Sequence, residues 1–276
     1  MVNKKKLAVF AAVAGNEIVK HKKDNAIEKK MPISPLTPHK KGFYERHIKR
    51  PLDVICAFMA IVCFFWLYAI IAIFVKIKLG SPVLFKQMRP GLNEKVFPLY
   101  KFRTMTDERE ENGKLLPDEV RLTKFGKWLR STSLDELPEA FNILNGTMSV
   151  IGPRPQLVRD MVFMTDKQKM RHAVKPGLSG LAQVNGRNGI SWEEKLDWDL
   201  RYIEKITFLG DVKIVFDTIG KAFIKKEGVV REGTVSDMDF GDWLLNEGKI
   251  NQAEYDKGQK IALEILEQAR KSNSVY

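Results

Sequence analysis

The chain has 276 residues, a formal net charge of +12 and a hydrophobic content of 44%, which allows one substantial domain with appendages. Its four scattered histidines exclude a zinc-binding pattern. Cys56 and Cys63 are too far apart along a helix to bond, so we expect a reduced, cytosol-facing protein without a disulfide framework.

Residues 1–41 form a basic N-terminal segment. Residues 1–50 contain 13 Lys and Arg against 4 Asp and Glu, so most of the net charge lies at this end. A basic chain end is typical of proteins that bind nucleic acid or lipid headgroups, although a solvated tail has the same composition. Because this segment offers little apolar surface to bury, we expect it to be flexible.

Residues 42–80 contain the most apolar stretch of the chain. From Val54 to Val75 the sequence has no charged residue, proline or glycine. About 20 apolar residues in a helix are enough to cross a bilayer core. A buried helix of a soluble protein is the alternative, but such helices rarely run this far without a polar face. We therefore predict a membrane-anchoring helix.

Positive charges flank both ends of this stretch. Lys49 and Arg50 precede it, and Lys76 and Lys78 follow it. Because Lys and Arg mark the cytoplasmic side of a membrane protein, two basic flanks favour a re-entrant helix that enters and leaves on the same face. A straight spanning helix remains open, since spanning helices also occur with two basic flanks.

Residues 81–228 are predicted to form one cytosolic domain of the α/β class, mostly helical with a small sheet. Two short strands are expected on either side of a turn at Pro90–Gly91. Apolar residues at helical spacing predict helices at residues 122–130, 134–144, 191–205 and 211–226. Residues 229–276 are predicted to be a polar C-terminal tail that contains a helix near residues 260–271.

An adjacent acid pair, Asp135 and Glu136, stands out in this basic chain. One interpretation is local: Ser133 caps a helix and Glu136, three residues on, completes a capping box. Acids also suit the first turn of a helix. The other interpretation is chemical: one carboxylate attacks phosphorus, as in aspartyl-phosphate enzymes, and its neighbour binds Mg²⁺.

Basic residues favour the chemical interpretation. Arg154 lies in a rigid Gly-Pro-Arg-Pro turn, and Arg130 comes shortly before the acid pair. Each cation alone is more simply a surface charge, but together such residues can hold a doubly anionic diphosphate through charge-assisted hydrogen bonds. The candidate substrate-binding residues are Lys101, Arg103, Arg130, Arg154 and Arg187.

Long blocks of the sequence resemble one known family, the bacterial monotopic phosphoglycosyl transferases, which are sugar transferases. The resemblance covers about residues 49–225. Its blocks read RPGLNEKVFPLYKFRTMTDERE, RLTKFGKWLRSTSLDELPEAFNILNGTMSVIGPRP, RHAVKPGLSGLAQVNGRNGISW and FLGDVKI. Such long, ordered blocks are far more specific than a single short motif.

The resemblance implies roles for individual residues. Asp135 matches the family's nucleophile, and Glu136 matches the acid that holds Mg²⁺. Asp211 also matches a family position, but we assign it no role. Four of the candidate cations fall on the family's basic positions around the site: Lys101, Arg130, Arg154 and Arg187.

The resemblance also implies a reaction. The nucleophile displaces UMP from a UDP-sugar, and undecaprenyl phosphate then attacks the sugar phosphoryl-aspartate. Residues 81–228 would be the catalytic domain, on the cytoplasmic face of the bacterial inner membrane, with the lipid bilayer as a further partner. The reaction would prime exopolysaccharide, capsule, lipopolysaccharide or other glycoconjugate synthesis.

One position departs from the family pattern, and two other functions fit parts of the sequence. Phe65–Trp66 stands where the family has a Ser-Pro pair that turns the membrane helix back, which leaves the re-entrant bend open. A membrane-bound phosphohydrolase would use the same acids with water as acceptor. A non-catalytic membrane or nucleic-acid binder would use only the basic face, but the sequence has no nucleic-acid-recognition motif, so we expect no nucleic acid partner.

Overall fold

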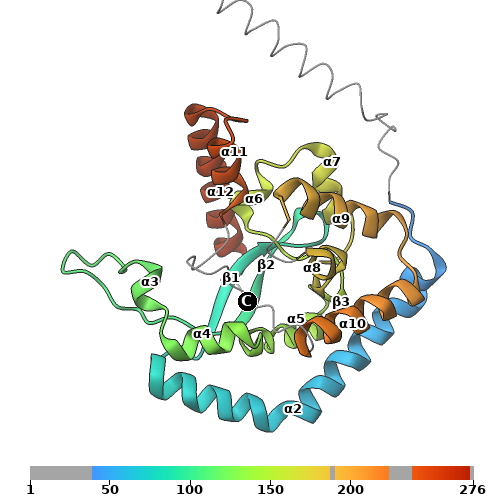
Figure 1. Ribbon diagram of the computed structural model, residues 1–276, viewed down its shortest axis with the longest axis horizontal. Helices are drawn as coiled ribbons and strands as arrows, with labels where there is room; N and C mark the ends of the chain where they lie inside the picture. Colours follow the sequence, from blue (N-terminus) through green and yellow to red (C-terminus); the bar gives the residue numbers. More distant parts are fainter. Residues whose placement is uncertain (1–38, 187–189, 224–237, 274–276) are drawn as a thin grey trace, which may run out of the picture. The chain divides into compact units, whose positions relative to one another are not determined.

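The computed structural model of the protein describes residues 39–186, 190–223 and 238–273 (Figure 1). The predictions for residues 1–38 and for Arg187 lie outside these residues. The helices are α2 (Lys49–Leu79), α3 (Asp118–Arg121), α4 (Lys124–Ser131), α5 (Glu139–Asn145), α6 (Val158–Met161), α7 (Asp166–Lys169), α8 (Leu181–Gly186), α9 (Trp192–Glu204), α10 (Phe208–Phe223), α11 (Phe240–Asn246) and α12 (Gln252–Asn273). Turns of π- or 3₁₀-helix are η1 (Tyr44–Ile48), η2 (Leu92–Glu94), η3 (Leu134–Glu136) and η4 (Met170–Ala173). The strands are β1 (Leu84–Pro90), β2 (Val96–Phe102), β3 (Ser149–Ile151) and β4 (Gly177–Ser179). The predicted fold class, mostly helical with small sheets, is confirmed.

The two predicted strands form the antiparallel hairpin β1–β2, in which Arg89 pairs with Phe97. Phe97 and Leu99 lie two residues apart on β2, so their side chains share one face. Both are buried in a cluster with residues of α2 and α5. Lys101 belongs to the same strand, so this packing sets the backbone position of Lys101.

A second small sheet pairs β3 with β4 in parallel, through Ser149 with Gly177 and Ile151 with Ser179. The sequence did not predict this pairing. The two backbone segments approach so closely that a Cβ added to Gly177 would lie 2.0 Å from the backbone nitrogen of Gly152. Only glycine permits such an approach. The sheet thereby holds the Gly-Pro-Arg-Pro turn that follows β3.

Helix α2 is confirmed as one long apolar helix. Together with η1 it is long and apolar enough to cross a membrane. Its buried residues lie in both halves: Asp53 and Ala57 in the first, Val75 and Leu79 in the second. Asp53 accepts a hydrogen bond from the Ser149 hydroxyl of β3, whereas Leu79 packs in a cluster with residues of β2 and α4. Both halves of α2 therefore contact the same domain.

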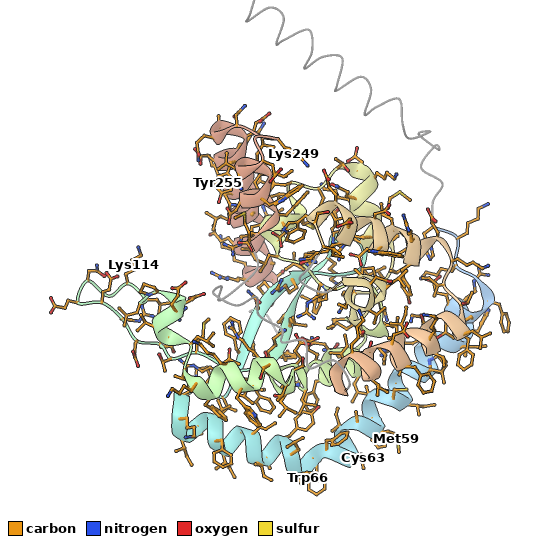
Figure 2. The ribbon with its side chains drawn as sticks, viewed as in Figure 1. Met59, Cys63, Trp66, Lys114, Lys249 and Tyr255 are labelled. Atoms are coloured by element: carbon orange, nitrogen blue, oxygen red, sulfur yellow. The ribbon has the colours of Figure 1, made fainter. Side chains whose placement is uncertain are left out.

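The opposite side of α2 is apolar and exposed. Figure 2 shows Met59, Cys63 and Trp66 pointing away from the rest of the domain, and the side chain of Phe65 is 68% exposed. Figure 1 shows α2 as a continuous ribbon that bends near its middle. The helix thus bends without the Ser-Pro pair, and both cysteines of α2, Cys56 and Cys63, are free.

The C-terminal helices α11 and α12 pack against α6. Asp160 of α6 is 2% exposed and accepts a hydrogen bond from the backbone nitrogen of Phe240 at 2.9 Å. Ala262 of α12 is buried against Val158 and Met161. The helix predicted near the C-terminus is confirmed as part of the longer α12, and these contacts join it to the segment that follows the Gly-Pro-Arg-Pro turn.

Candidate active site

The acid pair lies in the 3₁₀ turn η3, not in the first turn of an α-helix. The helix predicted over residues 134–144 is interrupted at Pro138, which has no N–H to donate, and α5 begins at Glu139. Ser133 has a left-handed φ of 55°, and its side chain makes no capping hydrogen bond. The capping-box interpretation of Ser133 and Glu136 is therefore wrong.

Glu136 is the centre of a charge cluster. Its Oε1 atom accepts hydrogen bonds from Lys101 Nζ at 2.7 Å and from Arg154 Nη2 at 2.6 Å. Burial by itself raises the pKa of the Glu136 carboxyl, but Arg154 and Lys101 outweigh burial and hold that pKa well below its ordinary value. Glu136 is therefore ionised at neutral pH, and it joins β2, η3 and the turn after β3.

Asp135 is buried, at 7% exposure, and its carboxylate accepts no hydrogen bond from the part of the chain that the structure describes. Burial raises the pKa of Asp135 to about 6, and the neighbouring Glu136 adds to the rise. Three cations oppose the rise: Lys101, Arg130 and Arg154. A carboxylate that is close to several cations and bonded to none of its described neighbours is available to attack an electrophile.

Sequence reasoning missed a third acid, Glu139. Its Oε1 atom lies 3.2 Å from Lys101 Nζ, and the residue is 2% exposed. Burial raises the pKa of the Glu139 carboxyl; Lys101 opposes the rise and Glu136 adds to it. The available signal was its place three residues after Glu136, a spacing that puts side chains on one side of a helical segment.

Arg154 is held in place through its own backbone. Arg171 is 2% exposed; it donates a hydrogen bond to the carbonyl oxygen of Arg154 at 2.6 Å and forms an ion pair with Asp199 at 2.7 Å. A Cβ added to Gly152 would lie 2.5 Å from a backbone oxygen. These contacts fix the turn and so direct the Arg154 side chain toward Glu136.

Arg130 is the third predicted cation that the structure brings to the acids. Its Nε atom donates a hydrogen bond to Thr104 Oγ1 at 3.0 Å. Asp135 is near enough to act on the charge of Arg130, although burial is the larger influence and lowers the pKa of the guanidinium. Arg130 therefore lies on the Asp135 side of the acid pair, whereas Lys101 and Arg154 bind Glu136.

Arg103 does not join this group. Its Nε atom donates to the carbonyl oxygen of Met105 at 2.8 Å. Its other two nitrogens contact the carbonyl oxygen of Ser81 and the carboxylate of Asp107. The geometry therefore gives no support to a substrate-binding role for Arg103, and the prediction for Arg187 falls outside the described residues.

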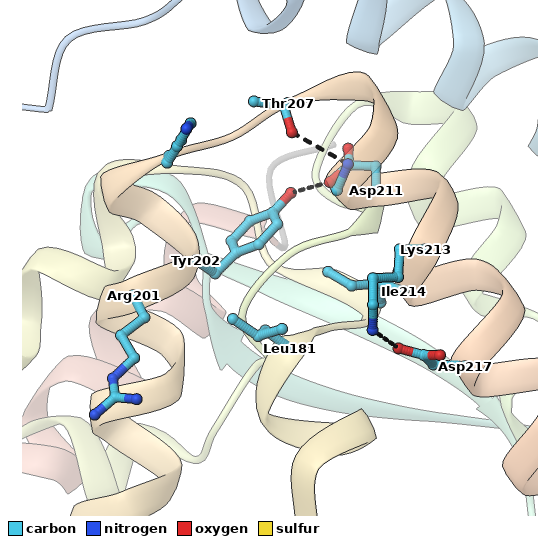
Figure 3. Close-up of a pocket in the computed structure, with 10 residues that line it drawn as sticks. Leu181, Arg201, Tyr202, Thr207, Asp211, Lys213, Ile214 and Asp217 are labelled. Atoms are coloured by element: carbon cyan, nitrogen blue, oxygen red, sulfur yellow. Dashed lines mark hydrogen bonds and ion pairs between the residues drawn. The ribbon is translucent and has the colours of Figure 1, made fainter.

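Asp211 joins the start of α2 to the rest of the domain. It is 5% exposed and accepts hydrogen bonds from Tyr44 at 2.9 Å, Lys49 at 2.5 Å and Tyr202 at 2.9 Å. A cavity of about 130 Å³ lies beside it between α9 and α10 (Figure 3). None of the predicted catalytic or binding residues lines this cavity. The hydrogen bonds of Asp211 connect η1, the start of α2 and α9.

The acid pair fits a Mg²⁺ ion that takes only one or two ligands from the protein. Mg²⁺ commonly binds in this way and fills its other positions with phosphate oxygens and water. In the described residues, no three His, Cys, Asp or Glu side chains are grouped to enclose a metal. Lys101 and Arg154 both bind Oε1 of Glu136, which makes Oε2 the candidate ligand atom of that carboxylate.

The chain is similar to several known proteins. The profile described as bacterial sugar transferase matches residues 44–225. The uncharacterized sugar transferase EpsL of Bacillus subtilis (strain 168) is 48% identical over 193 residues, which are 70% of this chain and 95% of that protein. UDP-glucose:undecaprenyl-phosphate glucose-1-phosphate transferases of Klebsiella pneumoniae and Escherichia coli (strain K12) are 38% and 36% identical over 71% of this chain. The matches span only 44% of each of these two longer relatives.

Proposed function

Because the chain belongs to the bacterial sugar transferase family of phosphoglycosyl transferases, we propose that it transfers a sugar 1-phosphate from a UDP-sugar to undecaprenyl phosphate and releases UMP. The observation that carries this proposal is Asp135, a buried carboxylate beside three cations with no hydrogen bond from the described residues. Two of the similar proteins are named for the same reaction with UDP-glucose. The product, an undecaprenyl-diphosphate sugar, would be the starting point for the assembly of a polysaccharide or another glycoconjugate.

The transfer proceeds in two steps at one phosphorus atom. A carboxylate oxygen of Asp135 attacks the sugar-linked phosphorus, the P–O bond to UMP breaks, and UMP leaves with the bonding electrons. An oxygen of undecaprenyl phosphate then attacks the same phosphorus, and Asp135 leaves as a carboxylate. The bond between the sugar C1 and its oxygen stays intact, so the anomeric configuration is kept.

The cations bind and orient the diphosphate. Lys101 and Arg154 already meet at Glu136, and a diphosphate entering beside them gains hydrogen bonds from the same two side chains. Arg130 adds positive charge on the Asp135 side. Glu136 would hold a Mg²⁺ ion, which would supply further charge neutralisation. Catalysis by this site is mainly positioning and charge neutralisation, as in other phosphoryl transfers.

The membrane helix is proposed to be re-entrant in the bacterial inner membrane, with the catalytic domain on the cytoplasmic side. A straight span would carry one end of α2 across the bilayer. Both halves of α2 contact one domain, through Asp53 with Ser149 and through Tyr68 with the carbonyl oxygen of Leu137. A domain held at both halves favours a helix that stays on one face of the membrane.

The test is an incubation of the purified protein with a panel of UDP-sugars, with and without undecaprenyl phosphate. The proposal predicts that UMP accumulates over many turnovers only when the lipid phosphate is present, together with a polyprenol-diphosphate sugar. A phosphohydrolase would instead release free sugar phosphate with or without the lipid. A non-catalytic binder would release no UMP from any member of the panel.

A further inference from the structure

The C-terminal helices α11 and α12 lie outside the family match but contact the matched part of the chain. The sugar transferase profile ends at residue 225, whereas both helices lie after residue 239. Helix α11 contacts α6, and α12 contacts both α6 and β2 (Figure 1). Because α6 follows the turn that contains Arg154, and β2 contains Lys101, the two helices touch both segments that supply a cation to Glu136.

A phenylalanine ring from the end of α6 lies between the two helices. The ring of Phe163 stacks on the ring of Tyr255 in α12, with an angle of 13° between their planes. A Cβ added to Gly241 of α11 would lie 2.5 Å from the Phe163 ring, and one added to Gly258 of α12 would lie 2.3 Å from it. Each of these helices therefore has a glycine where the ring leaves no room for a side chain.

Polar contacts fix the same junction. Asp160 of α6 is 2% exposed and accepts hydrogen bonds from the backbone nitrogens of Leu157 and Phe240, both at 2.9 Å. One carboxylate thus joins the residue before α6 to the first residue of α11. Arg159 of α6 also forms an ion pair with Asp239. A buried carboxylate is costly unless it is hydrogen-bonded, so separating α11 from α6 would be unfavourable.

Helix α12 also holds α6 against the β1–β2 hairpin. Val96 of β2, Val158 of α6 and Leu266 of α12 belong to one apolar cluster. Val96 begins the strand that contains Lys101. The helix therefore packs on two segments whose relative position decides whether the two cations of the site meet at one carboxylate oxygen.

We propose that α11 and α12 position the active site: by enclosing Phe163 and bonding Asp160, they hold the Arg154 turn against β2 and so fix where Arg154 meets the diphosphate of the UDP-sugar. Phe163 and Gly258 act through Arg154 and are positioning residues. This inference rests on the proposed function, because it names what keeps one cation of that site in place. A displacement of about 1 Å in a binding group can lower a rate about 100-fold, so a looser contact at Phe163 has a measurable effect on transfer.

The test enlarges residue 258 in the full-length protein. Gly258→Ala adds one methyl group and Gly258→Leu adds a larger side chain, so the smaller change serves if the larger one prevents folding. Alanine and leucine both favour a helix over glycine, so a loss would come from the contact with the ring. Leu263→Ala, at a residue of α12 that is 67% exposed, is the matched control. Each substitution is made with Arg154 present and again together with Arg154→Ala.

Two quantities are measured for every variant. The first is kcat/KM for the UDP-sugar, from UMP release with saturating undecaprenyl phosphate. The second is the rate of amide hydrogen exchange in residues 152–163, measured by mass spectrometry without substrates. Exchange reports the opening of this segment and does not depend on the reaction.

The inference predicts that kcat/KM falls about 5-fold in Gly258→Ala and about 30-fold in Gly258→Leu. In the Arg154→Ala background each of these substitutions should cost less than about twofold, because the side chain through which it acts is already absent. Residues 152–163 should exchange faster in both Gly258 variants. Leu263→Ala should match the wild type in both measurements.

Losses from Gly258 that multiply with the loss from Arg154→Ala would overturn the inference, because they would show a general effect on the fold. Unchanged kcat/KM in both Gly258 variants would overturn it as well, and so would exchange in residues 152–163 equal to that of the wild type. A wild type without lipid-dependent UMP release would instead refute the proposed function. The exchange comparison would then still decide whether α12 holds the Arg154 turn.

Discussion

Arg154 donates a hydrogen bond to Oε1 of Glu136 at 2.6 Å, which ties the Gly-Pro-Arg-Pro turn to the 3₁₀ turn that contains the acid pair. Lys101 approaches the same oxygen from β2. One carboxylate oxygen thus accepts hydrogen bonds from two cations that come from distant parts of the chain. The arrangement keeps positive charge beside Asp135 before any substrate arrives.

Replacing Arg154 tests the importance of this contact. Arg154→Ala should lower kcat/KM about 100-fold, because one charged donor to the diphosphate and to Glu136 is lost. Arg154→Lys should recover part of this loss, since lysine keeps the charge but not the two-pronged donor geometry. The measurement is the initial rate of UMP release with undecaprenyl phosphate present.

The same variants need a stability control, because the Arg154 side chain is 40% exposed. Ion pairs of this exposure contribute about 1 kcal/mol or less to folding. Thermal unfolding of Arg154→Ala should therefore shift by only a few degrees. A large loss of stability with unchanged kcat/KM in the surviving protein would assign Arg154 to the fold and not to the site.

The raised pKa of Asp135 predicts a pH-dependent effect of Asp135→Asn on stability. The folded protein holds this proton up to a pKa of about 6, whereas an unfolded Asp releases it near pH 4. The wild type therefore loses stability as the pH rises from about 4 to 6. Asparagine carries no charge at any of these pH values. The free energy of unfolding of the variant should therefore exceed that of the wild type by about 2–3 kcal/mol at pH 8, and the two should not differ in this way at pH 4.

Denaturant unfolding of both proteins at pH 4 and pH 8 measures this difference. Asp135→Asn should at the same time have no measurable transfer activity. If the two proteins were equally stable at both pH values, burial would not raise the pKa of the Asp135 carboxyl. The electrostatic argument for the reactivity of Asp135 would then fail.

The close approach of β4 to the turn after β3 predicts that Gly177→Ala is damaging. The added Cβ would lie 2.0 Å from the nitrogen of Gly152 and 2.5 Å from the carbonyl oxygen of Ser179. Backbone atoms cannot yield as side chains do, so we expect a loss of at least about 2 kcal/mol of unfolding free energy. We also expect a lower kcat/KM in the protein that remains folded, because the Arg154 turn moves.

Gly220→Ala is the matched control for this variant. A Cβ at Gly220 would meet nothing within 4 Å, and the residue lies inside α10, where alanine is favoured over glycine by about 1 kcal/mol. Gly220→Ala should therefore be neutral or stabilising by denaturant unfolding, with unchanged kinetics. If both glycine variants lost the same free energy of unfolding, the close backbone approach at Gly177 would not explain the effect of Gly177→Ala.

The left-handed backbone of Ser133 predicts opposite effects of two substitutions. Ser133→Gly should be neutral or stabilising, because glycine adopts a φ of 55° without strain. Ser133→Val should lose about 1–2 kcal/mol, because a β-branched residue is strained there. Urea unfolding measures both, and a valine variant as stable as the glycine variant would contradict the observed conformation.

Patterns confined to one segment were sufficient for much of the fold. The uncharged run from Val54 to Val75, the strands around Pro90–Gly91 and the amphipathic helix near residues 191–205 each bury a face that can be read from neighbouring residues. All three are confirmed. The family resemblance, which rested on ordered blocks, is confirmed by a match over residues 44–225.

The remaining features depend on residues far apart in the chain. A serine three residues before a glutamate is a capping signal in an isolated helix, but here Lys101 and Arg154, 35 and 18 residues away, bind Glu136. The burial of Glu139 and the closeness of Gly152 to Gly177 likewise follow only from tertiary packing. Arg103 was a candidate substrate-binding residue in the sequence, but its guanidinium contacts the carbonyl oxygens of Met105 and Ser81.

The most direct test of the account is a search for the covalent enzyme. The protein is incubated with Mg²⁺ and a UDP-sugar that it accepts, without undecaprenyl phosphate, and its intact and peptide masses are measured. The account predicts about one UMP released per enzyme molecule, a sugar-phosphate adduct on Asp135, and loss of that adduct when undecaprenyl phosphate is added. Multiple turnovers with the lipid but no adduct on Asp135, or an adduct on a different residue, would contradict it.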